Sequence, residues 1–182
     1  MRISAGTLKG RRLLAKTDLR PTAGKVRESL FNILGERIQD SIFIDLYAGT
    51  GAVGIEAMSR GALRVFFVES NKKAVDALKK TLEGCGCRAR ANIINKKVSS
   101  FVKSAIKEEL KADIIFLDPP YYSEELENIL PLLSEGDLIG KDAIIMAEHP
   151  SKKTLPDKTG VLTKKKTYRY GDTALTLYKV VK

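Results

Sequence analysis

The feature that most constrains the fold is a short apolar run that leads into a glycine-rich loop and then a helix. Residues 42–46 have the composition of a buried strand, and Gly49, Gly51 and Gly54 follow with the spacing G-x-G-x-x-G. Glycines let a backbone turn sharply and approach a ligand without side-chain interference. A helix that begins near Ala52 would point its free N–H groups into the same space. The pattern therefore predicts a nucleotide-type ligand at the end of a parallel strand.

Two acidic residues near this loop narrow the choice between NAD and S-adenosylmethionine. Glu69 follows an apolar run at 64–68, where an acidic residue would bind ribose hydroxyls. Asp45 stands just before the loop, where it would crowd the pyrophosphate of NAD but suit the ammonium and sulfonium of S-adenosylmethionine. The structural alternatives are that Asp45 caps loop amides and that Glu69, followed by Ser70 and Asn71, belongs to a helix cap.

A second constellation lies at Asp118-Pro119-Pro120-Tyr121, directly after the apolar run 114–117. The prolines fix the backbone, so a carboxylate, carbonyl oxygens and an aromatic ring share one stiff scaffold. Acceptors that bind the hydrogens of an exocyclic amino group make its nitrogen more nucleophilic, and Tyr121 would stack on the base that carries it. The alternative is a plain strand-to-loop turn. Tyr122 is predicted to pack.

The order of elements predicts an α/β fold of the Rossmann-like type, with a mostly parallel sheet, one antiparallel strand and an inserted closing hairpin. A short hairpin near 2–15 comes first, followed by a helix over 23–38 capped by Thr22. The other expected elements are strands near 42–46, 64–68, 90–94, 112–117 and 142–148, helices near 52–60, 71–83, 98–109 and 123–133, and a hairpin at 160–168 and 173–180.

Charge is concentrated at the two ends of the chain. Residues 1–30 carry eight basic residues against two acidic ones and residues 151–182 carry nine against two, whereas the middle carries fifteen against eighteen. Two basic flanks around a near-neutral centre predict a polyanionic partner. Arginines 11, 12, 20 and 27 are better candidates for phosphate than the lysines at 164–166, because guanidinium binds phosphate with two hydrogen bonds. The alternative is a solvated surface.

Length and composition are those of one domain over 1–182, with 1–20 a basic extension. No apolar run is long enough to span a bilayer, and no secretory segment is recognisable, so a cytoplasmic protein is expected. Cys85 and Cys87 form a lone Cys-x-Cys without a second ligand pair, so free thiols and no metal are expected.

The segments 3–13, 20–32 and 170–178, together with the two motifs above, resemble the RsmD-type guanine-N2 methyltransferases, which modify small-subunit ribosomal RNA. The resemblance implies S-adenosylmethionine as cofactor, the sheet order 3-2-1-4-5-7-6, and a monomer that acts on 16S ribosomal RNA, within an assembling small subunit. It implies that the cofactor is bound by Asp45, Tyr47, Ala48, Gly49, Gly51, Glu69, Ser70 and Val98. It implies catalysis by Asp118, Pro119, Pro120 and Tyr121, and RNA binding by Arg11, Arg12, Arg20, Thr22 and Arg27.

Several alternatives stay open at this level. An adenine-N6 methyltransferase, a non-catalytic RNA-binding assembly factor and a dehydrogenase share parts of the pattern. The chain departs from the family after the third strand, where the residue that reads adenine is unassigned between Asn95, Ser99 and backbone amides near Val98. His149 is expected to be structural or an edge contact instead of a general base. Arg27 would clamp an RNA phosphate or brace its helix against the cofactor loop.

Overall fold

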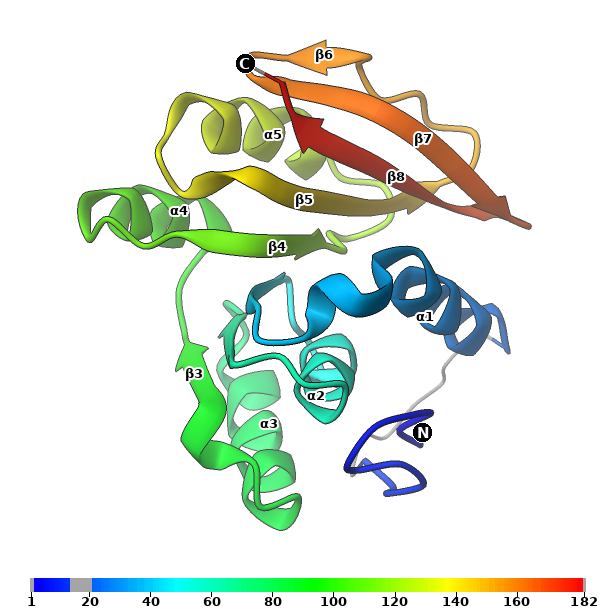
Figure 1. The fold of residues 1–182 in the computed structure, drawn as a ribbon, viewed down its shortest axis with the longest axis vertical. Coiled ribbons are helices and arrows are strands. Elements are labelled where there is room, and N and C mark those ends of the chain that lie inside the picture. Colours follow the sequence, from blue (N-terminus) through cyan, green and yellow to red (C-terminus); the bar gives the residue numbers. More distant parts are fainter. Residues whose placement is uncertain (1, 14–20, 182) are drawn as a thin grey trace.

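An eight-stranded sheet forms the centre of the molecule in the computed structural model, which describes residues 2–13 and 21–181 (Figure 1). Its order is β3-β2-β1-β4-β5-β8-β7-β6. The strands are β1 (Ile42–Leu46), β2 (Arg64–Val68), β3 (Ala91–Ile94), β4 (Ala112–Leu117), β5 (Ile139–Pro150), β6 (Lys158–Thr159), β7 (Leu162–Tyr170) and β8 (Thr173–Val180).

Strands β1 to β5 run parallel, and β8 pairs antiparallel with both β5 and β7. The predicted order is confirmed for the seven longer strands. The predicted strand number is too small by one, because the edge strand β6 has only two residues and pairs antiparallel with β7. A segment that short leaves no alternating pattern in the sequence. The structure also extends the predicted strand 142–148 to the bounds of β5.

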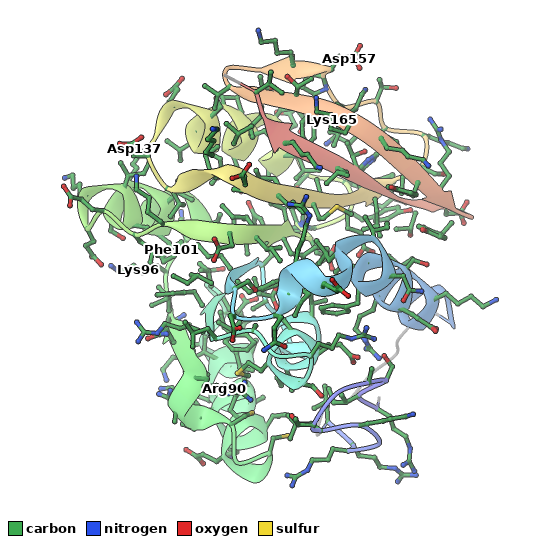
Figure 2. The ribbon with its side chains drawn as sticks, in the orientation of Figure 1. Arg90, Lys96, Phe101, Asp137, Asp157 and Lys165 are labelled. Atoms are coloured by element: carbon green, nitrogen blue, oxygen red, sulfur yellow. The ribbon has the colours of Figure 1, made fainter. Side chains whose placement is uncertain are left out.

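The helices cover the two faces of the sheet in separate groups. α1 (Pro21–Leu34), α2 (Ala52–Ser59) and α3 (Lys72–Gly84) pack on one face, where they share a core with Phe43, Phe67 and Phe116. α4 (Val98–Lys107) and α5 (Glu125–Glu135) pack on the other face against residues such as Ile44 and Ile115. Figure 2 shows Phe101 of α4, whose ring lies 6.4 Å from that of Phe66. The carboxyl ends of the parallel strands remain open between the layers.

The first helix differs from its prediction at both ends. It begins at Pro21, so Thr22 lies in the first turn and is not the N-cap residue. Proline is favoured at the first helical position, where its missing N–H costs nothing. The helix ends at Leu34 because Gly35 adopts a left-handed φ of 54°, and a 3₁₀ turn, Gly35–Ile38, continues from it.

The N-terminal segment forms a loop closed by an antiparallel bridge between Arg2 and Arg12. Ile3 donates to the Arg11 carbonyl at 3.1 Å, and Gly10 donates to the Ile3 carbonyl at 2.9 Å. Ile3 and Leu13 are buried in the core beside α1 and α2. The rest of the predicted hairpin, beyond residue 13, lies outside the described residues.

Candidate active site at the carboxyl edge of the sheet

The glycine loop after β1 is tightly packed on one side and open on the other. Gly51 has a φ of 75°, and a Cβ there would lie 2.2 Å from Leu78 Cδ1. A Cβ on Gly54 would lie 2.3 Å from Phe67 Cε1. Gly49 has a φ of 51°, but a Cβ there would meet nothing closer than the Tyr47 carbonyl at 3.9 Å. The loop therefore needs glycine for packing and conformation while Gly49 leaves its outer side accessible.

Asp45 connects β1 to the start of α2. Its side chain is buried, and Oδ2 accepts the Gly54 N–H at 2.9 Å. Burial raises the pKa of Asp45 to about 7, the Gly54 hydrogen bond opposes the shift, and the carboxylates of Asp118 and Glu69 add to it. The capping alternative therefore holds for one oxygen, while the residue also lines the cavity described below.

Glu69 holds the glycine loop from the end of β2. Its Oε2 accepts the Gly49 N–H at 2.9 Å, and its Oε1 accepts the Asn71 N–H at 2.7 Å. Asn71 is the N-cap residue of α3, where its side chain accepts the N–H groups of Lys73 and Ala74. A carboxylate has about four acceptor positions, so Glu69 retains the capacity to accept hydroxyl groups from a ligand.

Two cavities flank the loop along the carboxyl edge of the sheet. The inner cavity, of about 170 Å³, is lined by Arg27, Leu30, Asp45, Tyr47, Ala48, Gly49, Thr50, Ala52, Val53, Phe116, Asp118 and Glu148. The outer cavity, of about 260 Å³, is lined by Tyr47, Val68, Glu69, Ser70, Lys97, Val98, Ser99, Pro120 and Glu125. Tyr47 lines both cavities, and its hydroxyl donates to Glu125 Oε2 at 2.5 Å. Burial, followed by this contact, raises the pKa of Tyr47.

Three carboxyl groups from three adjacent strands meet in the inner cavity. They are Asp45 near the end of β1, Asp118 directly after β4 and Glu148 near the end of β5. Asp118 is exposed at the mouth, but the cavity walls displace enough water to raise its pKa to about 6. Burial and repulsion from Asp118 raise the pKa of Glu148 to about 8. Such a cluster favours a positively charged ligand.

Glu148 did not emerge from the sequence as a site residue, although a signal was present. It follows the apolar run Ala143–Ala147 of β5 in the same way that Asp118 follows the apolar run of β4. An acidic residue directly after a buried apolar run is the sequence signal that identifies Glu148 as a candidate site residue.

The two tyrosines after the prolines have different environments. Tyr121 is half-buried, its hydroxyl donates to the Asp172 carbonyl in the turn between β7 and β8, and its ring makes a T-shaped contact with Tyr122 at 5.4 Å. Tyr122 is 93% exposed, so the prediction that it packs is wrong. It lies in the turn after β4, and its ring contact among the described residues is the edge contact with Tyr121. Both rings line a further cavity with Lys152 and Lys153.

Asn95, Val98 and Ser99, between which the adenine contact is unassigned, lie after β3 in different environments. Asn95 donates through Nδ2 to the carbonyls of Glu69 and Ser70, at 2.9 and 3.0 Å, and so ties β3 to the loop after β2. Val98 and Ser99 line the outer cavity at the start of α4, whose N-terminus has no side-chain cap. The first backbone amides of α4 are therefore available to a ligand in the outer cavity.

The residues proposed for RNA binding are only partly described. Arg11 and Arg12 are exposed on the N-terminal loop, and Arg11 donates to the Gly84 carbonyl at 3.3 Å. Arg20 and the side chain of Thr22 lie outside the described residues. Figure 2 shows Lys165 on β7 and Asp157 beyond it. Lys164 forms an ion pair with Asp157 at 2.5 Å, so this lysine is not simply solvated.

Arg27 is predicted either to clamp an RNA phosphate or to brace its helix against the cofactor loop, and the contacts that the structure shows are with the N-terminal loop and α2. Its Nη2 donates to the Arg2 carbonyl at 2.8 Å, and its Nε lies 3.7 Å from Oε2 of Glu56 in α2. Burial lowers the pKa of Arg27, and the Glu56 carboxylate opposes this shift. The guanidinium also lines the inner cavity.

Glu56 organises the contacts between α2 and the N-terminal loop. Its side chain is fully buried, and its oxygens accept the N–H groups of Ser4 and Ala5, the Ser4 hydroxyl and the Arg60 guanidinium. No sequence pattern indicates this role, because one glutamate in a short helix is usually solvated.

His149 is a structural residue in this fold. It is buried, its Nε2 lies 2.8 Å from the Thr176 hydroxyl on β8, and its Nδ1 lies 2.9 Å from the Pro150 carbonyl. Burial lowers its pKa. Cys85 and Cys87 are free and buried in the core. Among the described residues, no cluster of side chains could hold a metal ion.

The sheet order, the antiparallel β8 between β5 and β7, and the glycine loop after β1 define the fold of the class I S-adenosylmethionine-dependent methyltransferases. Residues 1–179 match the family described as Conserved hypothetical protein 95. The chain belongs to this family, that of the RsmD-type methyltransferases.

Relatives with substantial identity cover nearly the whole chain. Ribosomal RNA small subunit methyltransferase D of Haemophilus influenzae is 37% identical over 92% of this chain and 89% of its own length. The protein of the same name from Escherichia coli K12 is 33% identical over 86% of this chain and 78% of its own length. A solved structure of a candidate methyltransferase from Escherichia coli, with 31% identity, covers 99% of this chain and 97% of its own with a TM-score of 0.87.

Proposed function

We propose that this protein transfers a methyl group from S-adenosylmethionine to the exocyclic N2 amino group of a guanine in small-subunit ribosomal RNA. The observation that carries the proposal is the inner cavity, which brings the Asp45 end of the glycine loop and Asp118 together. The names of the relatives support ribosomal RNA as the substrate. No helix among the described residues is long and apolar enough to cross a membrane, and a cytoplasmic site of action agrees with such a substrate.

The residues along the two cavities fit the cofactor from end to end. Asp45 would attract the cationic amino-acid end in the inner cavity, and Glu69 would accept the ribose hydroxyls in the outer one. Backbone amides at Val98 and Ser99 would read the adenine. The open outer side of Gly49 would let the backbone approach the ligand. The cofactor, when bound, supplies an electrophilic methyl group on a positively charged sulfur.

Catalysis would come mainly from alignment of the acceptor nitrogen. Asp118 would accept a hydrogen of the amino group and so increase the electron density available on nitrogen. Pro119 and Pro120 would hold this carboxylate and their own carbonyls rigidly. Tyr121, tethered through its hydroxyl to the Asp172 carbonyl, would keep its ring in place for the base to stack on. The proton released from nitrogen would leave through Asp118 or to water.

The Asp118→Ala variant tests the assignment of the reacting site. Because Asp118 is assigned to the amino group alone, the variant should bind S-adenosylhomocysteine with wild-type affinity in calorimetry but transfer no measurable methyl group to small-subunit ribosomal RNA. NAD should give no binding heat with either protein. Asp142→Ala, at the opposite end of β5, is the control and should behave as wild type. A fully active Asp118→Ala protein would refute the proposed site.

A further inference from the structure

Asp118 and Glu148 form a cross-strand pair. Leu117 of β4 is in register with Ala147 of β5, so the next residues on the two parallel strands are Asp118 and Glu148. Neighbouring strands lie about 4.8 Å apart. Side chains alternate between the two faces of a sheet, so Asp118 and Glu148 share a face with the residues two positions earlier on their strands. These residues, Phe116 and Met146, belong to the core beneath α1 to α3. Both carboxylates therefore point to that face of the sheet, into the inner cavity.

Neither carboxylate has a hydrogen-bond donor from the part of the chain that the structure describes. Asp45, by contrast, has the Gly54 N–H, and Glu69 has two backbone donors. Unpartnered carboxylates are costly where the protein displaces surrounding water, as it does around Asp118 and Glu148. A pair of them, side by side in a cavity, is suited to a ligand with two adjacent donors.

Guanine has such a pair of donors on its Watson–Crick edge, where N1–H lies next to the N2 amino group. Adenine has an N6 amino group next to N1, which is an acceptor and would repel a second carboxylate. We infer that Glu148 is a further binding residue for the acceptor base, which accepts guanine N1–H while Asp118 accepts a hydrogen of N2. This inference rests on the proposed function and assigns the choice of guanine over adenine to the Asp118–Glu148 pair.

The charged groups that face Glu148 across the cavity are Arg27 from α1, Asp45 from β1 and Asp118 from β4. Repulsion from Asp118 helps to raise the pKa of Glu148 to about 8, whereas N–H donors from a base favour the ionised form. Guanine binding therefore releases a proton from the pair. Methylation at subsaturating RNA should accelerate as the pH rises toward about 8.

The test uses the full chain, Glu148→Gln and, as a matched control, Asp142→Asn on the same strand. Mass mapping of oligonucleotide fragments of small-subunit ribosomal RNA methylated by wild type locates the target guanine. The target region is then rebuilt by ligation with either guanine or 2-aminopurine at that position. 2-Aminopurine keeps the amino group but replaces N1–H by an acceptor.

Wild type and Asp142→Asn should prefer guanine over 2-aminopurine by about tenfold to a hundredfold in kcat/KM, the usual scale for a hydrogen bond to a charged group. In Glu148→Gln the rate on guanine should fall by about tenfold. The preference for guanine over 2-aminopurine should become smaller or reverse, because the glutamine amide can donate a hydrogen bond to N1 of 2-aminopurine. The rise in rate toward pH 8 should disappear. Affinity for S-adenosylhomocysteine should not change.

Equal kcat/KM values of wild type on guanine and 2-aminopurine would overturn the inference. This comparison needs only the wild-type protein, so it tests the inference even if Glu148→Gln does not fold. A Glu148→Gln protein with wild-type rate and preference would also overturn it. If wild type forms no N2-methylguanosine in the ribosomal RNA, the proposed function itself fails, which is a different outcome.

Discussion

At the residue scale, the site is defined by acidic groups that the fold holds close together. Asp45, Asp118 and Glu148 come from three adjacent strands, and their pKa values are raised to about 7, 6 and 8. For a carboxyl group, a raised pKa means that the folded state holds its proton more tightly than the unfolded state does. The stability that this provides is present at low pH and is lost as the pH rises through the folded-state pKa. The ionised cluster therefore lowers the free energy of unfolding at neutral pH, and a cationic ligand would reduce this destabilisation.

The melting temperature should consequently fall as the pH is raised from 6.5 to 8.5, a window above the lowered pKa of His149. Each titrating carboxyl group contributes at most about 1.4 kcal/mol per pH unit, and less where solvent reaches it. Asp118→Asn removes the repulsion on Glu148 and should make the fall shallower, whereas Asp142→Asn should leave it unchanged. Thermal unfolding monitored by circular dichroism measures the slopes. A steeper fall in Asp118→Asn would contradict the assignment of the raised pKa values.

At the scale of elements, hydrophobic periodicity predicts the strands, and the ends of the strands predict where the site residues lie. Strands β1, β2, β4 and β8 have the predicted bounds, since each is an uninterrupted apolar or alternating run with clear breaks. The site residues at strand ends follow from the same pattern. Contacts between segments that are distant in the sequence produce no such local pattern. The Glu56 network, the tether from Tyr121 to Asp172 and the exposure of Tyr122 depend on how elements meet in space, and no local pattern encodes them.

The contacts of Arg27 predict how α1 is held against α2. Arg27→Ala removes the hydrogen bond to the Arg2 carbonyl and one cation next to the buried Glu56, so the variant should unfold about 1–3 kcal/mol more easily. Lys25→Ala, an exposed change in the same helix, should leave stability unchanged. Chemical denaturation measures both. If Arg27→Ala instead weakens RNA binding at wild-type stability, the phosphate-clamp hypothesis is the better one.

At the scale of the whole molecule, basic residues gather at the two ends of the chain. In Figure 1 the N-terminal loop lies beneath α1, and the C-terminal strands β6 to β8 form the opposite edge of the sheet. The Glu56 network fixes the N-terminal loop to α2, so the exposed Arg11 and Arg12 are presented from a defined surface.

Replacement of Arg11 and Arg12 together by alanine should weaken RNA binding and reduce its salt dependence by about one to two units of slope, because each lost phosphate contact releases roughly one fewer counterion. Affinity for S-adenosylhomocysteine should stay at the wild-type value. Filter binding over a series of salt concentrations gives the slope. A double variant with the wild-type slope would show that this flank is only a solvated surface.

The identity of the methylated nucleoside tests the proposed activity most directly. Purified protein, S-adenosylmethionine and small-subunit ribosomal RNA that lacks its natural methylation are incubated, and the RNA is digested and analysed by mass spectrometry. The expected product is N2-methylguanosine at a single position. N6-methyladenosine in its place, or no methylated nucleoside from a folded protein that binds the cofactor, would contradict the proposed activity.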